Sequence, residues 1–165
     1  MSYVEQNVSP GENIRFTGQV HWWIYIGPLV LVFLGLAVLA LEASIPSTEA
    51  SPLPVLLGTV LFLIGAVKLI SGLVYAGTTE LAVTDRKVIG KWGFIRRDTI
   101  EQRLDTVDAT LVHQSLFGRL FNFGNIAVRG SGTTNTPIRM IAKPLDFRKA
   151  VDAGVAEFET RNRNS

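Results

Sequence analysis

The stretch WWIYIGPLVLVFLGLAVLAL, residues 22–41, and the stretch LPVLLGTVLFLIGAVKLISGLVY, residues 53–75, decide the architecture of this chain. Each has about the ~20 apolar residues that an α-helix needs to cross the hydrocarbon core of a bilayer. The first contains no charged side chain, and the second contains one, Lys68. A buried helix of a soluble protein is usually shorter and keeps a polar stripe, which the first stretch lacks. We therefore predict an integral membrane protein with a two-helix hairpin.

The charges around the two stretches predict their orientation. The segment before the first stretch has more acidic than basic residues and no small-residue cleavage pattern follows, so we interpret the stretch as a retained anchor. The connector, residues 42–52, contains Glu42 and Glu49 and no Lys or Arg. The basic residues beyond the other ends of the stretches are Arg15, Arg86, Lys87, Lys91, Arg96 and Arg97. The positive-inside rule then places the connector outside and both termini in the cytoplasm.

The composition limits the chemistry available to the chain. Its 165 residues leave room for a hairpin and one small domain, and the absence of cysteine excludes disulfides and thiolate chemistry. From residue 77 onward, 14 Lys and Arg stand against 10 Asp and Glu. Such a basic domain is attracted to an anionic leaflet. A domain that is merely soluble and obeys the positive-inside bias fits the same charges, so both interpretations stay open.

The pattern changes after the second apolar stretch to short strands with polar turns between them. The alternation predicts strands at residues 80–84, 88–92, 98–104, 107–112, 125–129 and 137–141. A helix follows from Pro144, with one apolar stripe formed by Phe147, Ala150, Val151, Gly154, Val155 and Phe158. We predict an α+β domain over residues 77–158, in which antiparallel strands form a barrel or sandwich capped by the C-terminal helix. Residues 159–165 form a polar tail.

A strand pattern also precedes the first apolar stretch. Residues 13–20 alternate Ile14, Phe16, Gly18 and Val20 with polar side chains. Because both ends of the hairpin lie on one side, this strand within residues 1–21 can pair with the sheet edge of the later domain. The hairpin, residues 22–76, would then be an insertion between two strands of one domain. An extended linker is the alternative interpretation.

Several stretches of this chain resemble the bacterial pleckstrin-homology-like domain family, of the membrane-linked type with two transmembrane helices. They are residues 79–89, 94–101, 114–120 with 123–124, 128–130 and 144–148, and the order of membrane helices and domain is similar too. The resemblance implies a PH-like fold and a protein of the bacterial cytoplasmic (inner) membrane. It also implies a non-catalytic binding or assembly platform. Eukaryotic relatives bind inositol phosphates through a basic first hairpin, but that spaced motif is not clear here.

The sequence contains no evident catalytic or metal-binding constellation. The two histidines, His21 and His113, are far apart, and neither has nearby acidic residues at a metal-site spacing. His113 is followed by Gln114 and Ser115, but adjacent residues do not by themselves form a nucleophile and base pair. We predict no enzymatic activity, no cofactor and no small-molecule substrate. Nucleic acid is not expected as a partner, because the aromatic residues lie in apolar runs and not among the basic ones.

Basic residues suggest contacts with lipid headgroups. Five lie at or near predicted turns of the first strands, namely Arg86, Lys87, Lys91, Arg96 and Arg97. Under a bilayer they can contact the phosphates of anionic lipids. Lys68 lies about 10 Å of helix from Tyr75 and can extend its amine to the same interface. A sharper interpretation is that Lys68 pairs with a lipid phosphate or a partner carboxylate.

Two further groups of residues predict helix–helix or subunit contacts. Gly58, Gly65 and Gly72 recur every seven residues, and small residues let helices approach closely in lipid. They serve either packing within the hairpin or association with another membrane protein. Apolar residues also crowd the stretch after His113 at a spacing that suits a short helix. The stretch either plugs the barrel or, through Phe117 and Phe121 above all, contacts the membrane or another subunit.

The most favoured function is a non-catalytic inner-membrane protein whose cytoplasmic domain recruits or assembles proteins. Membrane lipids and other membrane proteins or further copies of the chain are the expected partners. An anionic-lipid-binding module is the second hypothesis, and an accessory subunit of a transporter or protease complex is the third.

Overall fold

The computed structural model describes residues 3–44, 51–94, 98–130 and 137–163. The chain divides into two compact units, one made of Met1–His21 with Tyr75–Ser165 and the other of Trp22–Val74. We call them the strand unit and the hairpin unit and describe each by itself. The two ranges of the strand unit lie on either side of the hairpin unit in the sequence.

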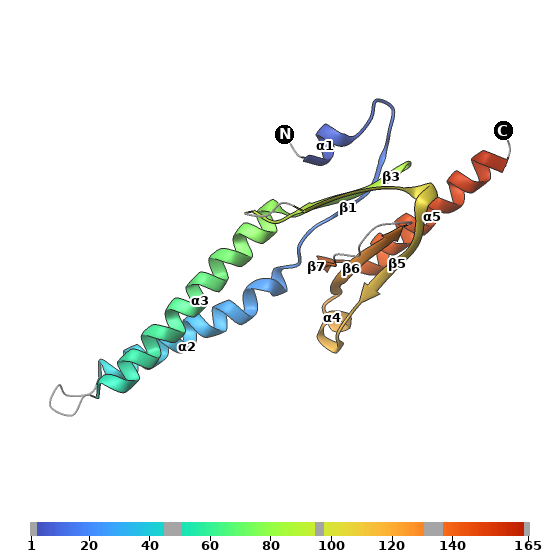
Figure 1. Ribbon diagram of the computed structural model, residues 1–165. Helices are drawn as coiled ribbons and strands as arrows, with labels where there is room; N and C mark the ends of the chain where they lie inside the picture. Colours follow the sequence, from blue (N-terminus) through green and yellow to red (C-terminus); the bar gives the residue numbers. More distant parts are fainter. Residues whose placement is uncertain (1–2, 45–50, 95–97, 131–136, 164–165) are drawn as a thin grey trace. The chain divides into compact units, whose positions relative to one another are not determined.

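The hairpin unit contains η1 (Trp22–Tyr25), α2 (Ile26–Glu42) and most of α3 (Pro52–Thr78). Both helical stretches are long and apolar enough to cross a membrane. In the most apolar window of each, only 6% and 11% of the residues are buried inside the protein, which differs from the core helix of a soluble protein. Figure 1 shows α2 and α3 side by side.

A carboxylate ties the start of α3 to the end of α2. Glu42 is buried, and its Oε1 accepts a hydrogen bond of 2.9 Å from the backbone N–H of Ser51, one residue before the helix begins. A negative charge is favourable at a helix N-terminus, and proline suits the first helical position, here Pro52. One of the two acids of the predicted outer connector therefore has a structural role.

The first sheet of the strand unit has four antiparallel strands in the order β1 (Ile14–Gly18), β2 (Glu80–Thr84), β3 (Lys87–Trp92) and β4 (Asp98–Arg103). β1 pairs with β2 across the insertion, with Gly18 opposite Leu81. The short α1 (Tyr3–Asn7) packs on β2 and β3, and the Val4 N–H donates to the Glu80 carboxylate at 3.1 Å. The N-terminal segment is thus part of this sheet, and not an extended linker.

The second sheet has three antiparallel strands in the order β5 (Val107–His113), β6 (Phe123–Gly130) and β7 (Ile138–Ala142). The 3₁₀ turn η2 (Leu104–Thr106) leads from β4 into β5, and α4 (Leu116–Leu120) connects β5 to β6. Figure 1 shows β5, β6 and β7 together, with α4 at one end of them.

The segment that follows β1 links the two sheets. Val20 forms a β-bridge with Ile141, the Ala142 N–H donates to the Gln19 carbonyl at 2.8 Å, and the His21 N–H donates to the Met140 carbonyl at 2.6 Å. One continuous segment therefore pairs first with β2 and then with β7. Among the described residues, β4 pairs only with β3 and β5 only with β6, so the strands do not close into a barrel.

The helix α5 (Pro144–Arg163) covers the core between the sheets. Phe147 and Val151 are fully buried among Leu81, Leu104 and other apolar side chains of both sheets. A Cβ on Gly154 would lie 2.7 Å from Leu104, which explains the glycine in the apolar stripe. The apolar hairpin, the antiparallel sheets and the C-terminal helix confirm the predicted fold class, except that the barrel is open. The helix continues beyond Phe158 to Arg163.

Candidate functional site

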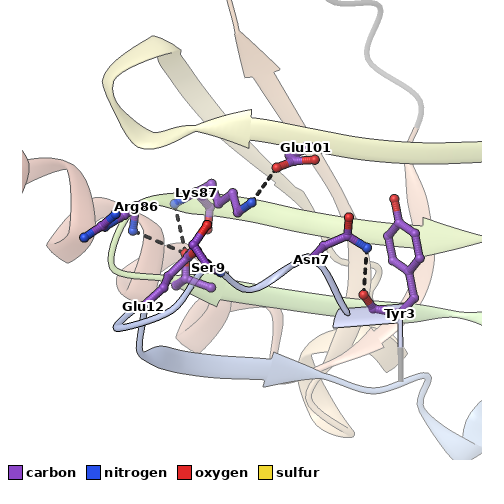
Figure 2. Close-up of polar contacts among 8 residues, drawn as sticks. Tyr3, Asn7, Ser9, Glu12, Arg86, Lys87 and Glu101 are labelled. Atoms are coloured by element: carbon purple, nitrogen blue, oxygen red, sulfur yellow. Dashed lines mark hydrogen bonds and ion pairs between the residues drawn. The ribbon is translucent and has the colours of Figure 1, made fainter. Parts of the chain in front are cut away.

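The turn between β2 and β3 holds two of the predicted headgroup contacts, Arg86 and Lys87. The buried hydroxyl of Thr84 accepts hydrogen bonds from the backbone N–H groups of Arg86 and Lys87, at 3.2 and 2.9 Å, and donates to the Glu12 carboxylate at 2.5 Å. Lys87 points toward Glu101 (Figure 2). Its amine lies 2.5 Å from a carboxylate oxygen of Glu101. The Lys87 side chain is only 14% exposed, so of the two residues Arg86 is the one that faces solvent.

Glu12 is a charged anchor for this turn. Its carboxylate accepts hydrogen bonds from Thr84 and from the Ser9 N–H, at 2.8 Å in the second case. Burial alone raises the pKa of Glu12, but these hydrogen bonds and the charge of Lys87 outweigh it, so that the pKa lies below its ordinary value. The ionised carboxylate holds the N-terminal segment against the turn.

The other predicted headgroup contacts are not gathered around Arg86. Lys91 lies five residues farther along β3, about 17 Å away at the rise of an extended strand. Its amine lies 5.1 Å from the centre of the Tyr3 ring. Arg96 and Arg97 lie outside the described residues, and Lys68 is an exposed residue of the hairpin unit. Within the strand unit, the structure therefore does not bring Arg86 and Lys91 into one cluster.

The glycines of α3 face α2 within the hairpin unit. A Cβ on Gly65 would lie 2.7 Å from the backbone nitrogen of Val32, and a Cβ on Gly58 would lie 2.9 Å from Leu39. Gly72 is also buried, and its Cβ position lies 3.5 Å from the Tyr25 ring. Because glycines let two helix backbones approach, packing inside the hairpin accounts for Gly58 and Gly65, whereas the 3.5 Å at Gly72 is an ordinary contact distance.

The short helix α4 presents apolar side chains to solvent. We call four of them the α4 tip: Leu116, Phe117, Leu120 and Phe121, with exposed fractions of 83%, 61%, 74% and 37%. The interpretation of this stretch as a barrel plug is wrong for Leu116 and Leu120. The buried apolar residue here is Phe123, which already belongs to β6.

The attachment of α4 to the sheet explains why its tip points outward. The Gln114 amide donates to the carbonyls of Gly118 and Phe123, at 3.2 and 3.1 Å, and the Ser115 hydroxyl accepts the Gly118 N–H at 3.1 Å. A Cβ on Gly118 would lie 2.6 Å from the Phe123 carbonyl oxygen. Polar groups and a glycine thus occupy the inner side of α4, which leaves its large apolar side chains on the outer side.

A recess of about 690 Å³ lies beside α4 and opens to solvent. Two arginines, Arg119 and Arg148, line it together with His113, Gln114 and Asn122. Val112 and Leu145 line it as well, so apolar, polar and cationic side chains share its wall. Arg148 also lies 3.6 Å from the Asp152 carboxylate, an exposed pair on α5.

The two histidines lie at the same end of the strand unit. His21 stacks on Phe123 with 5.2 Å between ring centres, and burial lowers its pKa. His113 pairs with Asn125 at the end of β5. Within the part of the chain that the structure describes, no three His, Asp or Glu side chains come close enough to hold a metal ion.

The comparison with family models gives a match to the bacterial PH domain over residues 26–154, most of the chain. The chain belongs to the bacterial PH domain family. This confirms the family resemblance of the sequence, and the match includes the two apolar helices, the strands β2 to β7 and the first half of α5. No curated protein and no solved structure matches the chain.

Membership of the bacterial PH family fixes the general class of activity. PH-like domains are generally non-catalytic modules that bind lipids or proteins. The features of this bacterial PH domain that are open to a partner include its exposed surfaces and those strand edges that pair with no other described strand.

Sequence reasoning did not single out the basic residues around α4. Arg119 lies within α4 itself, Lys143 follows β7, and Arg148 lies in the second turn of α5. They are distant in sequence and reach one end of the bacterial PH domain only because β5, β6 and β7 pair as they do. The exposure of the α4 tip could not be predicted from the sequence either, since an apolar cluster in a segment between two strands is typical of both a buried plug and a contact surface.

Proposed function

We propose that this bacterial PH protein is a two-span protein of the inner membrane, with both termini in the cytoplasm. Its PH-like domain binds partner proteins there and has no catalytic role of its own. In this proposal residues 1–21 and 75–165 belong to the cytoplasmic domain, with α5 continuing to Arg163, and residues 22–74 form the membrane hairpin.

The insertion of the hairpin between β1 and β2 supports the membrane part of the proposal. The chain leaves the strand unit at His21 and returns at Tyr75. His21 and Tyr75 both contact β7: the His21 N–H donates to Met140, and the Tyr75 hydroxyl accepts the Arg139 N–H at 3.0 Å. A single folded domain thus holds both ends of the hairpin, which requires both ends to lie on one side of a membrane.

The edge of β5 is the main structural support for the proposal that the domain binds partner proteins. Among the described residues β5 pairs only with β6, so its other edge presents backbone N–H and C=O groups. Edge strands are usually protected by charges. Another edge strand, β4, has charged side chains at three of its six residues, whereas β5 has one in seven and exposes Leu111. An extended segment of a partner can add to such an edge as a further strand.

Site-specific photocrosslinking in native membranes tests this function. A photoreactive amino acid at Leu111 should give one adduct of defined mass. The matched control carries the same amino acid at Ala156, an exposed position of α5. Adding Leu111→Lys to a chain with the crosslinker at Asp108 should abolish the adduct, because a lysine on an edge opposes strand addition. Equal adducts at Leu111 and Ala156, or none at Leu111, would contradict the proposal.

The membrane part has its own test. The full chain should remain in the pellet after alkaline carbonate extraction, and external protease should leave its C-terminal part intact in spheroplasts. Release by carbonate would refute the two-span anchor, whatever the crosslinking result.

The two other hypotheses are less well supported. A lipid-binding role through the first hairpin is less well supported because Lys87 pairs with Glu101. In addition, Arg86 lies just before β3, whereas Lys91 lies near its other end. If the Arg96→Glu, Arg97→Glu variant still binds liposomes, lipid binding does not depend on those two residues. An accessory role in a transporter or protease complex would require stoichiometric co-purification with that complex in mild detergent.

A further inference from the structure

The α4 tip is an apolar surface that the strand unit does not cover. Leu116 and Leu120 are each more than 70% exposed, and Phe117 is 61% exposed. The hydrogen bonds of Gln114 and the close approach of Gly118 to Phe123 fix the backbone of α4 on the sheet, so the tip cannot simply fold inward. Clustered exposed apolar residues of this kind mark an interaction surface.

Chain connectivity places this surface close to the membrane junction. Phe123, which follows α4, stacks on His21 at 5.2 Å between ring centres. His21 is the last residue of the strand unit before the hairpin unit begins at Trp22. The α4 tip therefore lies at the end of the strand unit from which the chain enters its first apolar helix.

Cationic side chains surround the tip. Arg119 is exposed within α4, and Arg148 lines the same recess. Lys143 is exposed, and its backbone N–H donates to the carbonyl of Asn122, just beyond α4, at 2.9 Å. The carboxylates near them on α5 are Asp146 and Asp152, of which Asp152 lies by Arg148. Three basic side chains thus stand against two acidic ones near the tip, and this small net positive charge complements an anionic membrane surface.

We infer that the α4 tip inserts into the headgroup region of an anionic phospholipid bilayer, with Arg119 and Lys143 at the level of the lipid phosphates. The inference rests on the proposed membrane anchor. An apolar surface rimmed by Lys and Arg is the composition of interfacial membrane segments. Because the anchor keeps the domain beside the bilayer, the tip meets lipid at a high effective concentration, and even a small apolar surface can bind the membrane.

Single-cysteine labelling of the full chain tests the inference, and the absence of native cysteine makes it direct. Leu120→Cys carries an environment-sensitive fluorophore in vesicles that contain phosphatidylglycerol and a brominated lipid quencher. We expect blue-shifted, quenched emission at this position. Ala156→Cys on α5 is the control on the domain, and Phe33→Cys on α2 is the control for the anchor.

The three positions separate the two proposals. Quenching at Leu120→Cys and Phe33→Cys but not at Ala156→Cys supports the inference. Quenching at Phe33→Cys alone overturns the α4 contact and leaves the anchor standing, whereas no quenching at Phe33→Cys overturns the anchor and the inference with it. Blue-shifted emission at Leu120→Cys without lipid quenching means that protein covers the tip, which also overturns the inference.

A second experiment tests the role of the basic residues around the α4 tip. Arg119→Glu in the labelled chain should lower the equilibrium constant for insertion by at least about fivefold, from about 1 kcal/mol for each basic residue near an anionic surface. Arg163→Glu at the far end of α5 is the matched charge change and should have little effect. Vesicles of phosphatidylcholine alone should remove the difference. Equal effects of the two substitutions would overturn the role of Arg119.

Discussion

Two buried threonines of the strand unit, Thr84 and Thr110, differ in whether their hydroxyls are hydrogen-bonded. The hydroxyl of Thr84 takes part in hydrogen bonds to Glu12 and to the β2–β3 turn. The hydroxyl of Thr110 in β5 is buried and makes no hydrogen bond to any described residue. A buried polar group without a partner costs stability, and a paired one contributes to it.

We therefore expect opposite effects from one substitution at the two sites. Thr110→Val should raise the free energy of unfolding by about 1 kcal/mol, because it removes a buried unpaired hydroxyl. Thr84→Val should lower it by about 1–3 kcal/mol, because the turn N–H groups and Glu12 lose their partner. Denaturant unfolding in detergent, followed by the tryptophan signal, measures both. A loss of stability in Thr110→Val would show that this hydroxyl has a partner.

Glu12 makes stability depend on pH. Its pKa in the folded protein is lowered from 4.5, so its contribution is present above that value and is lost as the pH falls through the lower, folded-state pKa. Glu12→Gln should therefore lower stability by about 1 kcal/mol at neutral pH and flatten its decline in acid. Thermal unfolding at neutral pH and well below pH 4.5 measures this, with Glu159→Gln on exposed α5 as the control. An unchanged acid decline in Glu12→Gln would exclude Glu12 as its source.

At the scale of elements, the glycines of the hairpin permit a close helix pair. Gly65→Ala should destabilise the hairpin by about 1–3 kcal/mol, because its Cβ would lie 2.7 Å from the backbone of Val32. Gly27→Ala is the matched control, since nothing lies within 4 Å of its Cβ position and alanine is the better helix former. Thermal unfolding in detergent compares them. Equal midpoints for both variants would mean that the helices are not packed this closely.

Most elements follow from the sequence because their signals are local. Residues 98–104 alternate and residues 80–84 form a short apolar run before a polar turn, and β4 and β2 lie there. Which side chains of β5 are buried is harder to predict from the sequence, because the pairing of β5 with β6 has an irregularity between Val107 and Ala109. Beyond it Thr110 is buried and Leu111 exposed, the reverse of what hydrophobicity indicates. The alternation cannot reveal such a bulge, since it depends on the partner strand.

Long-range features were only partly predictable. The alternation of residues 13–20 indicated a strand, and β1 with its continuation pairs with both sheets. The open barrel and the basic rim of α4 were not visible, because they depend on which strands meet in space. The predicted headgroup contacts shared a sequence neighbourhood, but a strand separates Arg86 from Lys91. Individual strands and helices can thus be predicted from the local sequence. Which residues share a surface depends on how the strands pair.

At the scale of the whole molecule, the hairpin should be dispensable for folding of the strand unit. Replacing residues 22–74 by a short Gly/Ser linker should leave a folded domain, because His21 and Tyr75 both contact β7. Deleting residues 1–21 should instead unfold or aggregate it, because the edge of β2 with Leu81 and Val83 loses β1. Circular dichroism and size-exclusion chromatography compare the two. A folded, monomeric deletion variant would show that β1 is not needed.

The pairing of β1 with β2 also has a consequence during synthesis. The ribosome makes the first strand before the apolar helices and its neighbour strand after them, so the sheet is completed only when the hairpin has been made. If the hairpin crosses the membrane as proposed, insertion of its first segment into the wrong compartment would put β1 and β2 on opposite sides of the lipid. The sheet would then lack its edge strand. Folding of the strand unit would thus depend on correct insertion of the hairpin.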